Sequence, residues 1–266
     1  PNAQNDIFFS NSIEYQNQKY RIIEIGENAF KNNKKIKTVY FSQDSAINLF
    51  QSHCFYFSSL EFISIPKSVT IIEQFSFSNC NKLKNVIIST KSLLNTICKG
   101  AFSRSSIEQF TIPSNVKKIE EGAFMHCQKL KKIEFEMIVD LKSFEKDLFA
   151  YSNIKKIMIP ACVENISEQV FYSCEKLKSV KFENNSEIKS FGKNSFAFSS
   201  IENFEILSTV TSIGEGSFSS CKKLKKIEFS HNSKIELIEK VVFSRSSIEF
   251  ITIPSSVKKI GKRCFG

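Results

Sequence analysis

The side chains best suited to nucleophilic chemistry in this sequence are an adjacent histidine and cysteine, His126 and Cys127. A Cys–His pair can activate a thiolate, provided that the imidazole reaches the sulfur. Neighbouring residues of a strand or turn point apart, however, which favours an exposed histidine beside a buried cysteine. The other histidines are His53 and His231, and neither an H-x-x-x-H nor an H-E-x-x-H motif is present. Since G-x-S-x-G, G-x-G-x-x-G and P-loop motifs are also missing, we predict no catalytic residue and no enzymatic activity.

The eight cysteines could do chemistry as zinc ligands or as disulfides. Zinc sites usually contain C-x-x-C pairs with further Cys or His nearby, and the sequence has no C-x-x-C. We therefore predict no metal site and no cofactor. Four cysteines hold scattered positions: Cys54, Cys98, Cys162 and Cys264. The other four recur every 47 residues, which indicates an internal repeat, and they are Cys80, Cys127, Cys174 and Cys221.

Phenylalanine shows the same period. The chain of 266 residues contains 27 Phe and no Trp. A subset, which we call the anchoring Phe residues, alternates at gaps of 22 and 25, so that one short and one long unit make 47 residues (22 + 25): Phe8, Phe30, Phe55, Phe77, Phe102, Phe124, Phe149, Phe171, Phe196, Phe218, Phe243 and Phe265. The spacing predicts that these side chains stack into one apolar column around which the chain winds.

Each unit carries the pattern of one short strand and a return segment. After the anchoring Phe comes L-x-x-I-x-F, as in residues 130–135, and its final alternation fits a strand with one buried face. An apolar residue also lies five positions before the Phe, in a segment whose three-residue step fits a helical or 3₁₀ turn. We predict an α/β repeat solenoid with alternating 22- and 25-residue coils, a parallel sheet on one face and short helical or irregular return segments.

The four periodic cysteines, here called the ladder cysteines, each lie three residues after an anchoring Phe. Successive coils should be about 4.8 Å apart, which places these cysteines, on alternate coils, about 10 Å from one another. A disulfide needs Cα atoms within roughly 7 Å, so the ladder cysteines cannot pair among themselves. We predict that most cysteines are buried thiols that act as small apolar side chains, and leave open whether the remaining four pair.

Carboxylates also follow the repeat. Short units carry Glu and long units carry Lys directly after the strand's first apolar residue, with Lys155 as the exception: Lys37, Glu61, Lys84, Glu108, Lys131, Lys178, Glu202, Lys225 and Glu249. Opposite charges on neighbouring coils should help the stack modestly and keep its register. This alternation favours a structural role for the carboxylates over a catalytic pair.

The two unit types resemble the BspA-like subclass of leucine-rich repeats, whose repeat reads roughly L-x-x-I-x-L-P-x-x-L-x-x-I-G-x-x-A-F-x-x-C. The nearest stretches are I-G-E-G-S-F-S-S-C at 213–221 and I-G-E-N-A-F at 25–30, and the resemblance covers roughly residues 20 to 266. It implies a non-catalytic surface antigen of a bacterium or parasitic protist, cell-surface or secreted, that acts in adhesion to a host-cell or extracellular-matrix protein. Sequons at Asn165 and Asn184 permit glycosylation without indicating it.

Net charge is +10, from 37 Lys and Arg against 27 Asp and Glu. Nucleic-acid readers usually concentrate Arg, yet here Arg stands only at Arg21, Arg104, Arg245 and Arg263. The Lys residues alternate with Glu instead of forming one basic stripe, so we predict no nucleic-acid partner. Apolar runs span only a few residues, which predicts no insertion of this fragment into a membrane.

The recognition surface should be the face lined by the strands. Residues between the buried strand positions point outward there, and they vary while the framework repeats. The N-terminal end of this face is apolar and its middle is charged, and exposed aromatics are candidate hot spots. Alternatively, Phe62 and Phe250 merely pack on their neighbours. The predicted ligand-binding residues are Tyr40, Phe62, Asn85, Ile87, Gln109, Thr111, Lys132, Glu134, Lys156, Met158, Lys181, Lys226 and Phe250.

The domain organisation follows from where the repeat weakens. We predict an N-terminal cap or degenerate repeat at residues 1–20, where Gln16 and Gln18 at would-be core positions favour a polar hairpin centred on Asn17. Residues 21–266 should form the solenoid, of about ten to eleven coils, the last one incomplete. Solenoids normally need polar caps. The protein therefore either continues in a longer form, or acts as a structural element whose copies stack end to end.

Overall fold

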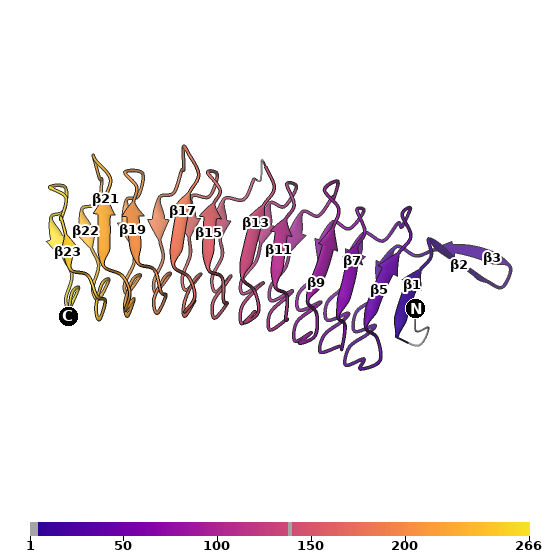
Figure 1. Cartoon of the computed structure of the whole chain (residues 1–266). Helices are drawn as coiled ribbons and strands as arrows, with labels where there is room; N and C mark the ends of the chain where they lie inside the picture. The colour runs from indigo at the N-terminus through magenta and orange to yellow at the C-terminus, as the bar shows by residue number, and fades with distance from the viewer. Residues whose placement is uncertain (1–4, 138–139) are drawn as a thin grey trace. The chain divides into compact units, whose positions relative to one another are not determined.

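The structure, a computed structural model, describes residues 5–137 and 140–266. These residues form β-solenoid coils, most of which carry a longer strand on one face and a two-residue strand on the return path (Figure 1). The chain divides into two compact units, Pro1–Asp140 and Leu141–Gly266. Each unit is a stack of the predicted leucine-rich-repeat coils, which confirms the fold class.

The longer strands, here called the front strands, form parallel sheets within each unit. In the first unit β1 (Asp6–Phe9), β5 (Thr38–Phe41), β7 (Phe62–Ile65) and β9 (Asn85–Ile88) make one sheet, and β11 (Gln109–Ile112) pairs with β13 (Lys132–Phe135). In the second unit β15 (Lys156–Ile159) pairs with β17 (Ser179–Phe182), and β19 (Asn203–Ile206), β21 (Lys226–Phe229) and β23 (Phe250–Ile251) make a sheet. Their second and fourth residues point inward, because side chains alternate along a strand.

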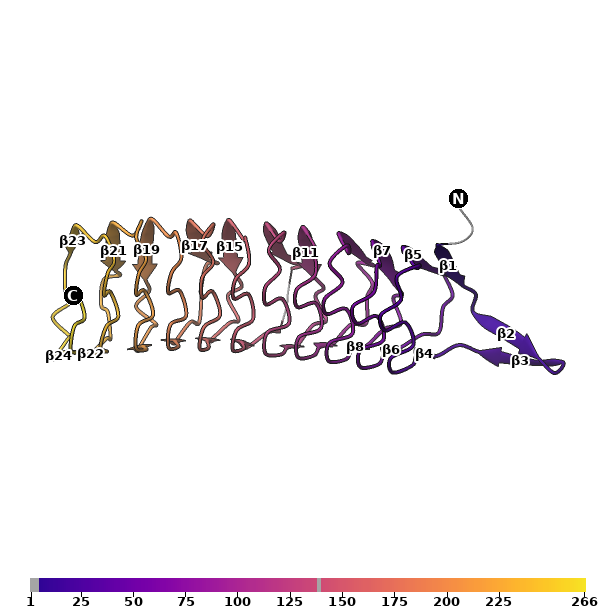
Figure 2. The ribbon, with the colours of Figure 1, turned by 90° about the horizontal axis from the view of Figure 1, so that it is seen from below.

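The return path holds a second set of parallel strands, which lie opposite the front strands in Figure 2. These return strands are β4 (Glu24–Ile25), β6 (Leu49–Phe50), β8 (Ile71–Ile72), β10 (Thr96–Ile97) and β12 (Lys118–Ile119), then β14 (Ser143–Phe144), β16 (Asn165–Ile166), β18 (Ser190–Phe191), β20 (Ser212–Ile213), β22 (Leu237–Ile238) and β24 (Lys259–Ile260). No helix occurs in the two described ranges. The helical alternative was therefore wrong, because the apolar residue five before each Phe is a β-favouring Ile or Phe that pairs with its neighbour.

The turn around each anchoring Phe places two residues in the left-handed region. Around Phe55 these are His53 and Phe57, both with φ of 58°, and in other coils the same two positions hold varied residues, among them several Asn and Gly. This backbone aims the N–H groups of all three residues at carbonyl oxygens of the next coil, at 2.8–3.1 Å. The turn thus satisfies its polar groups between coils, as strands do.

The anchoring Phe rings stack within each unit, as predicted. Successive ring centroids are 5.0–5.7 Å apart, with interplanar angles of 19° or less, from Phe30 to Phe124 and from Phe149 to Phe265. Offset stacking at this distance is favourable between aromatic rings. The column therefore stabilises the same step from coil to coil that the two sets of strands define.

Phe8 does not belong to this column, and its assignment there was wrong. It lies on β1, in register with Tyr40 of β5, and its side chain is 66% exposed. The neighbouring Phe9 points inward instead, with its ring centroid 5.2 Å from that of Phe41. The spacing to Phe30 matched the short unit only by coincidence, since Phe8 is a strand residue and the other anchoring Phe residues lie in turns.

All eight cysteines are free thiols, and the ladder cysteines are buried as predicted. Each ladder sulfur lies 3.3–3.5 Å from a serine hydroxyl of the preceding coil and 3.0–3.2 Å from the carbonyl oxygen of that coil's anchoring Phe. Burial raises the pKa of each ladder thiol to about 11. These side chains are therefore neutral hydrogen-bonding links between coils.

The predicted charge column is present in part. Ion pairs join Lys131 to Glu108 at 2.9 Å, and Lys178 to Glu202 and Lys225 to Glu249 at 3.4 Å each. A second alternating column, which was not predicted, lies three residues before the anchoring Phe and includes the pairs Lys99–Glu121 at 3.0 Å and Lys240–Glu215 at 3.2 Å. In both columns Lys is thus interleaved with carboxylates of the neighbouring coil.

A hairpin follows β1, at the position predicted around Asn17. Strands β2 (Ser12–Tyr15) and β3 (Gln18–Arg21) pair in antiparallel fashion. Gln16 and Asn17 between them have φ of 50° and 60°, as a two-residue type I′ turn requires. The hairpin extends away from the front strands of its unit (Figures 1 and 2), and its side chains are mostly exposed. Its capping role and the boundary at residue 20 stay predictions.

Candidate functional site

The first and third residues of the front strands form a continuous outward surface within each unit, here called the outer strand face. Every predicted ligand-binding residue lies on it. The first unit contributes Tyr40, Asn85, Ile87, Gln109, Thr111, Lys132 and Glu134, all exposed, and the half-buried Phe62. The second unit contributes Lys156, Met158, Lys181, Lys226 and Phe250, all exposed.

The first unit has an apolar patch at its N-terminal end. Phe8 and Tyr40 lie side by side in the β1–β5 register, and the ring centroid of Tyr40 is 5.3 Å from that of Phe62. Ile87 is diagonal to Phe62 on β9 and is 56% exposed. We call these four residues the N-terminal apolar patch. Phe8 was not among the predicted ligand-binding residues, although the pattern D-I-F-F places one of its two Phe residues outward on any strand.

Further along the first unit the outer strand face becomes polar. Gln109 and Thr111 on β11 lie opposite Lys132 and Glu134 on β13. The Lys132 ammonium and the Glu134 carboxylate pair along their own strand at 2.7 Å. Each charge on β13 is therefore balanced by its neighbour, with neutral side chains opposite.

The second unit brings some predicted residues together and separates others. Lys156 lies opposite Ser179, and Met158 lies opposite Lys181, on the β15–β17 pair. Lys226 lies opposite Phe250 on β21 and β23, beyond the intervening β19. The alternative that Phe250 merely packs on its neighbours is wrong, because 81% of its surface is exposed.

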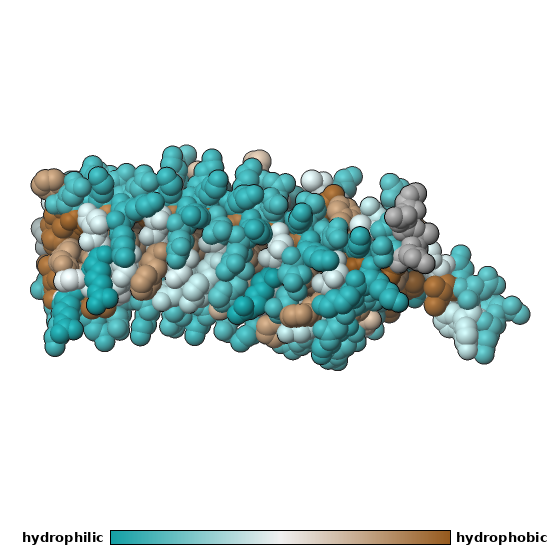
Figure 3. All heavy atoms as spheres, turned by 60° about the horizontal axis from the view of Figure 1, so that its bottom comes forward, coloured by the Kyte–Doolittle hydropathy of each residue, from teal (hydrophilic) through white to brown (hydrophobic). Residues whose placement is uncertain are grey.

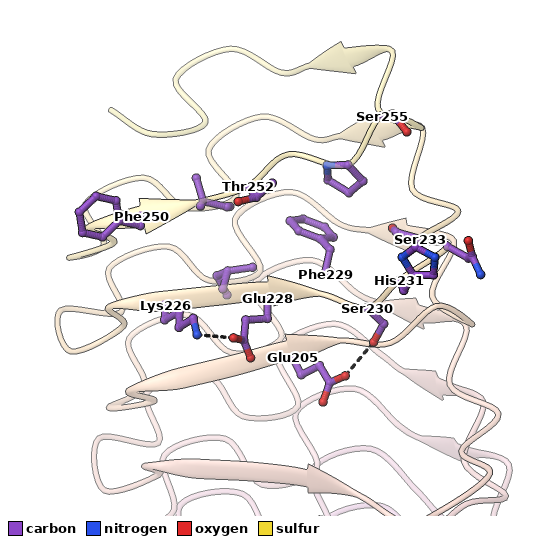
Figure 4. Close-up of a pocket in the computed structure, with 14 residues that line it drawn as sticks. Glu205, Lys226, Glu228, Phe229, Ser230, His231, Ser233, Phe250, Thr252 and Ser255 are labelled. Carbon is purple, nitrogen blue, oxygen red and sulfur yellow. Dashed lines mark hydrogen bonds and ion pairs between the residues drawn. The ribbon is translucent and has the colours of Figure 1, made fainter.

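A hollow of about 650 Å³ opens between β21 and β23 (Figure 4). The two strands pair only through Lys226 with Phe250 and Ile227 with Ile251, so they diverge beyond that point. The lining residues are Glu205, Lys226, Ile227, Glu228, Phe229, Ser230, His231, Asn232, Ser233, Phe250, Ile251, Thr252, Pro254 and Ser255. We call this the β21–β23 hollow. Of its residues, only Lys226 and Phe250 were among the predicted ligand-binding residues.

The Cys–His pair is not arranged for nucleophilic chemistry. The Cys127 sulfur is buried and hydrogen-bonded to Phe102 and Ser105, and burial raises its pKa to about 11. Burial lowers the pKa of His126 below its ordinary value. Both shifts keep the two groups neutral near pH 7, whereas a nucleophilic pair needs a thiolate.

Two further properties describe the surface. Within residues 5–137 and 140–266, His, Cys, Asp and Glu side chains form no group of three that could hold a metal ion, and no helix there is suited to cross a membrane. In Figure 3 the visible face is mostly hydrophilic, with brown and tan apolar patches set apart from one another. Separate apolar patches with polar surroundings are typical of interaction sites.

In each unit, the parallel front strands, stacked Phe rings and buried Cys–Ser links define a leucine-rich-repeat solenoid with a regular outer strand face. More specifically, the chain belongs to the family of BspA type leucine rich repeat regions, which matches it in 6 copies over residues 2–131 and 142–266. This family is one of repeat scaffolds, which is consistent with a role in protein–protein interaction. No curated protein matches the chain.

Solved structures are similar to this fold. A leucine-rich repeat protein from Bacteroides ovatus matches with a TM-score of 0.78 and 23% identity, over 98% of this chain and 72% of that chain. The pneumococcal vaccine antigen PcpA matches with a TM-score of 0.59 and 20% identity, over 100% and 70%. A leucine-rich repeat protein of T. pallidum matches with a TM-score of 0.51 and 18% identity, over 82% and 77%. At these identities the likeness concerns the fold.

Proposed function

We propose that this chain is a non-catalytic protein-binding scaffold that holds a protein ligand on its outer strand face. The observation that carries the proposal is the N-terminal apolar patch. Phe8, Tyr40, Phe62 and Ile87 project from rigid paired strands, with the polar Thr38, Ser64 and Asn85 between them. Exposed aromatic side chains surrounded by polar ones are frequent hot spots of protein interfaces. Because the strands hold the patch in place, its ordering on binding costs little entropy.

The proposed ligand is a host-cell or extracellular-matrix protein, met at the cell surface or after secretion. Membership of the BspA type family supports an interaction role, and a similar fold carries the name of a vaccine antigen. Nucleic acid fits the face less well. Lys132 and Lys226 each pair with a Glu two residues along the same strand, which weakens their attraction for phosphate.

A binding screen tests this proposal. Wild-type protein is presented to a panel of extracellular-matrix and host-surface proteins, together with a triple variant, Phe8→Ser, Tyr40→Ser and Ile87→Ser. We expect the variant to lose at least about a hundredfold in affinity for the ligand, since each of the three lost anchors weakens the interface by about 1 kcal/mol or more. Thermal unfolding checks that the variant is folded.

The chain offers a matched control on its other face. Ile71 and Leu237 are exposed apolar residues of the return strands β8 and β22. A double variant, Ile71→Ser and Leu237→Ser, removes apolar surface without touching the outer strand face, and we expect it to bind normally. Equal binding by the triple variant and the wild type would show that the patch is not the site.

End-to-end self-association stays an alternative prediction. It requires two copies to join through the ends of their coils and not through the outer strand face. Size-exclusion chromatography with light scattering over a range of concentrations measures this directly. A monomer at every concentration contradicts stacking, whereas concentration-dependent growth that survives the triple substitution supports it.

A further inference from the structure

Two carboxylates face each other across the front sheet of the second unit. Glu205 on β19 lies directly opposite Glu228 on β21, and both side chains point outward and are exposed. Among the strand pairs of the described residues, this is the one place where two like charges stand in register. Like charges in directly opposite positions destabilise a sheet. The arrangement runs against the rest of the chain, where Lys and Glu alternate.

The local cations do not balance these two carboxylates. Glu228 pairs with Lys226 on its own strand (Figure 4). Glu205 accepts a hydrogen bond from the Ser230 hydroxyl at 2.7 Å, and in the two described ranges no Lys or Arg forms an ion pair with it. Of the two carboxylates, therefore, only that of Glu228 forms an ion pair within the described residues. An ionised carboxylate has about four acceptor positions, so both groups can accept further donors.

The β21–β23 hollow adds apolar walls beside this excess negative charge. Phe229 and Phe250 line it together with Ile251 and Pro254, and the Phe250 ring is largely exposed (Figure 4). Its volume of about 650 Å³ exceeds what one amino-acid side chain needs. A group that fits must carry positive charge at one end and apolar or aromatic-stacking surface along its length.

A comparison of strand β13 with strand β21 shows which feature is specific to the β21–β23 hollow. It reads K-I-E-F, the same four residues as β21, and it has the same ion pair, between Lys132 and Glu134. Opposite Glu134 stands the neutral Thr111, where Glu228 has Glu205. The repeat itself therefore supplies the ion pair, and the second carboxylate is specific to the hollow.

We propose that the β21–β23 hollow receives an arginine side chain of the protein ligand. A guanidinium group is planar and carries five N–H donors, so it can bridge Glu205 and Glu228 and remove their repulsion. Its methylene stem would pack on Phe250, which lies diagonal to Glu228. A lysine ammonium supplies charge without the planar fork. This subsite deepens the proposed function, because it names the side chain that the ligand presents to the second unit.

The subsite can be tested without the ligand. Isotope-labelled protein is titrated with Nα-acetyl-L-arginine amide, and NMR follows the backbone amides of Glu205, Glu228 and Phe250. We expect saturable shifts at these amides, a weaker response to the lysine analogue, and none to the citrulline analogue, which has the same shape without charge. Glu205→Gln and Glu228→Gln should each weaken arginine binding about tenfold, because each removes a charge-assisted contact. The matched control, Glu134→Gln, should leave binding unchanged.

Several outcomes would overturn the subsite. These are no saturable shift up to the solubility limit of the probe, equal shifts with the citrulline or lysine analogue, or an equal loss in the Glu134→Gln variant. A second readout tests the repulsion itself: Glu205→Gln should raise the melting temperature, and a lower one contradicts the premise. Loss of ligand binding in the apolar-patch variant together with failure of the probe would remove this subsite and keep the proposed function. If the probe binds while the apolar-patch variant still binds the ligand normally, the subsite stands and the proposed role of the N-terminal apolar patch is contradicted.

Discussion

The sulfur of Cys127 lies 3.1 Å from the carbonyl oxygen of Phe102, one coil earlier in the stack. The Ser105 hydroxyl is 3.5 Å from the same sulfur. A thiol has one hydrogen, so once it donates to the carbonyl, the hydroxyl must donate to sulfur. Each long unit is thereby hydrogen-bonded to the turn of the preceding short unit. This explains why Cys recurs in long units where short units have Ser.

A double-mutant cycle measures that link. Cys127→Ala leaves the buried Ser105 hydroxyl without its acceptor, which should cost about 1–3 kcal/mol of unfolding free energy. Ser105→Ala should lose less on the Cys127→Ala background than on the wild type. We expect a coupling energy of about 0.5–1.5 kcal/mol from urea titrations. Additive effects would mean that the Ser105 hydroxyl does not bond to the sulfur.

The ladder thiols should also make stability fall at alkaline pH. Burial raises the pKa of Cys80, Cys127, Cys174 and Cys221 from 9.0 to about 11. A thiol with a raised pKa in the folded state binds more protons there than in the unfolded state. Its contribution is therefore complete below about pH 9 and is lost as the pH rises towards about 11.

Urea unfolding at pH 8, 9, 10 and 11 measures this loss. The matched control replaces all four ladder cysteines by Ser, which does not titrate in this range. We expect the free energy of unfolding of the wild type to fall more steeply between pH 9 and pH 11 than that of the control. Parallel curves would show that Lys and Tyr, and not the thiols, set the alkaline limit.

The register of the front strands was predictable from the sequence because the repeat constrains it twice, through the alternation of buried and exposed residues and through the stacking of the anchoring Phe residues. A slip of one residue would expose Ile133 and bury Lys132, and the anchoring Phe residues would lose their stacking. The outward positions were therefore predictable as a set. Phe8 was wrongly assigned to the anchoring Phe residues because a spacing of 22 residues does not reveal whether a Phe belongs to a turn or to a strand.

The β21–β23 hollow could not be predicted in the same way. The spacing of residues 226–229 and 250–253 is that of the other front strands, yet β23 pairs along two residues only. A loss of pairing of this kind depends on the conformations of the loops on either side, and the repeat spacing does not predict those conformations. The return strands illustrate a different limit, since a three-residue step with Ile or Phe is compatible with a turn and with a short strand.

Glycine at position 192 should be required by the return path. A Cβ atom there would lie 2.5 Å from the carbonyl carbon of Ser167 and 2.6 Å from the amide nitrogen of Glu168. Backbone atoms cannot move aside without shifting a coil, so we expect Gly192→Ala to destabilise the protein by about 1–3 kcal/mol. Gly26 is the matched control, because a Cβ there meets nothing within 4 Å. If both variants unfold at the same urea concentration, close packing at Gly192 does not limit stability.

Val241 should be replaceable with a gain in stability. It stands two residues before Phe243 with a φ of 52°, a left-handed conformation that is rare for a β-branched residue. The same turn position holds Asn28 and Asn194 in other coils. Val241→Asn keeps the backbone hydrogen bond from residue 241 to Lys262, and it should raise the free energy of unfolding by about 1 kcal/mol. The neighbouring Val242 is buried, so Val242→Asn should destabilise the protein instead. Urea titration of the two variants separates relief of backbone strain from a general tolerance of Asn in this turn.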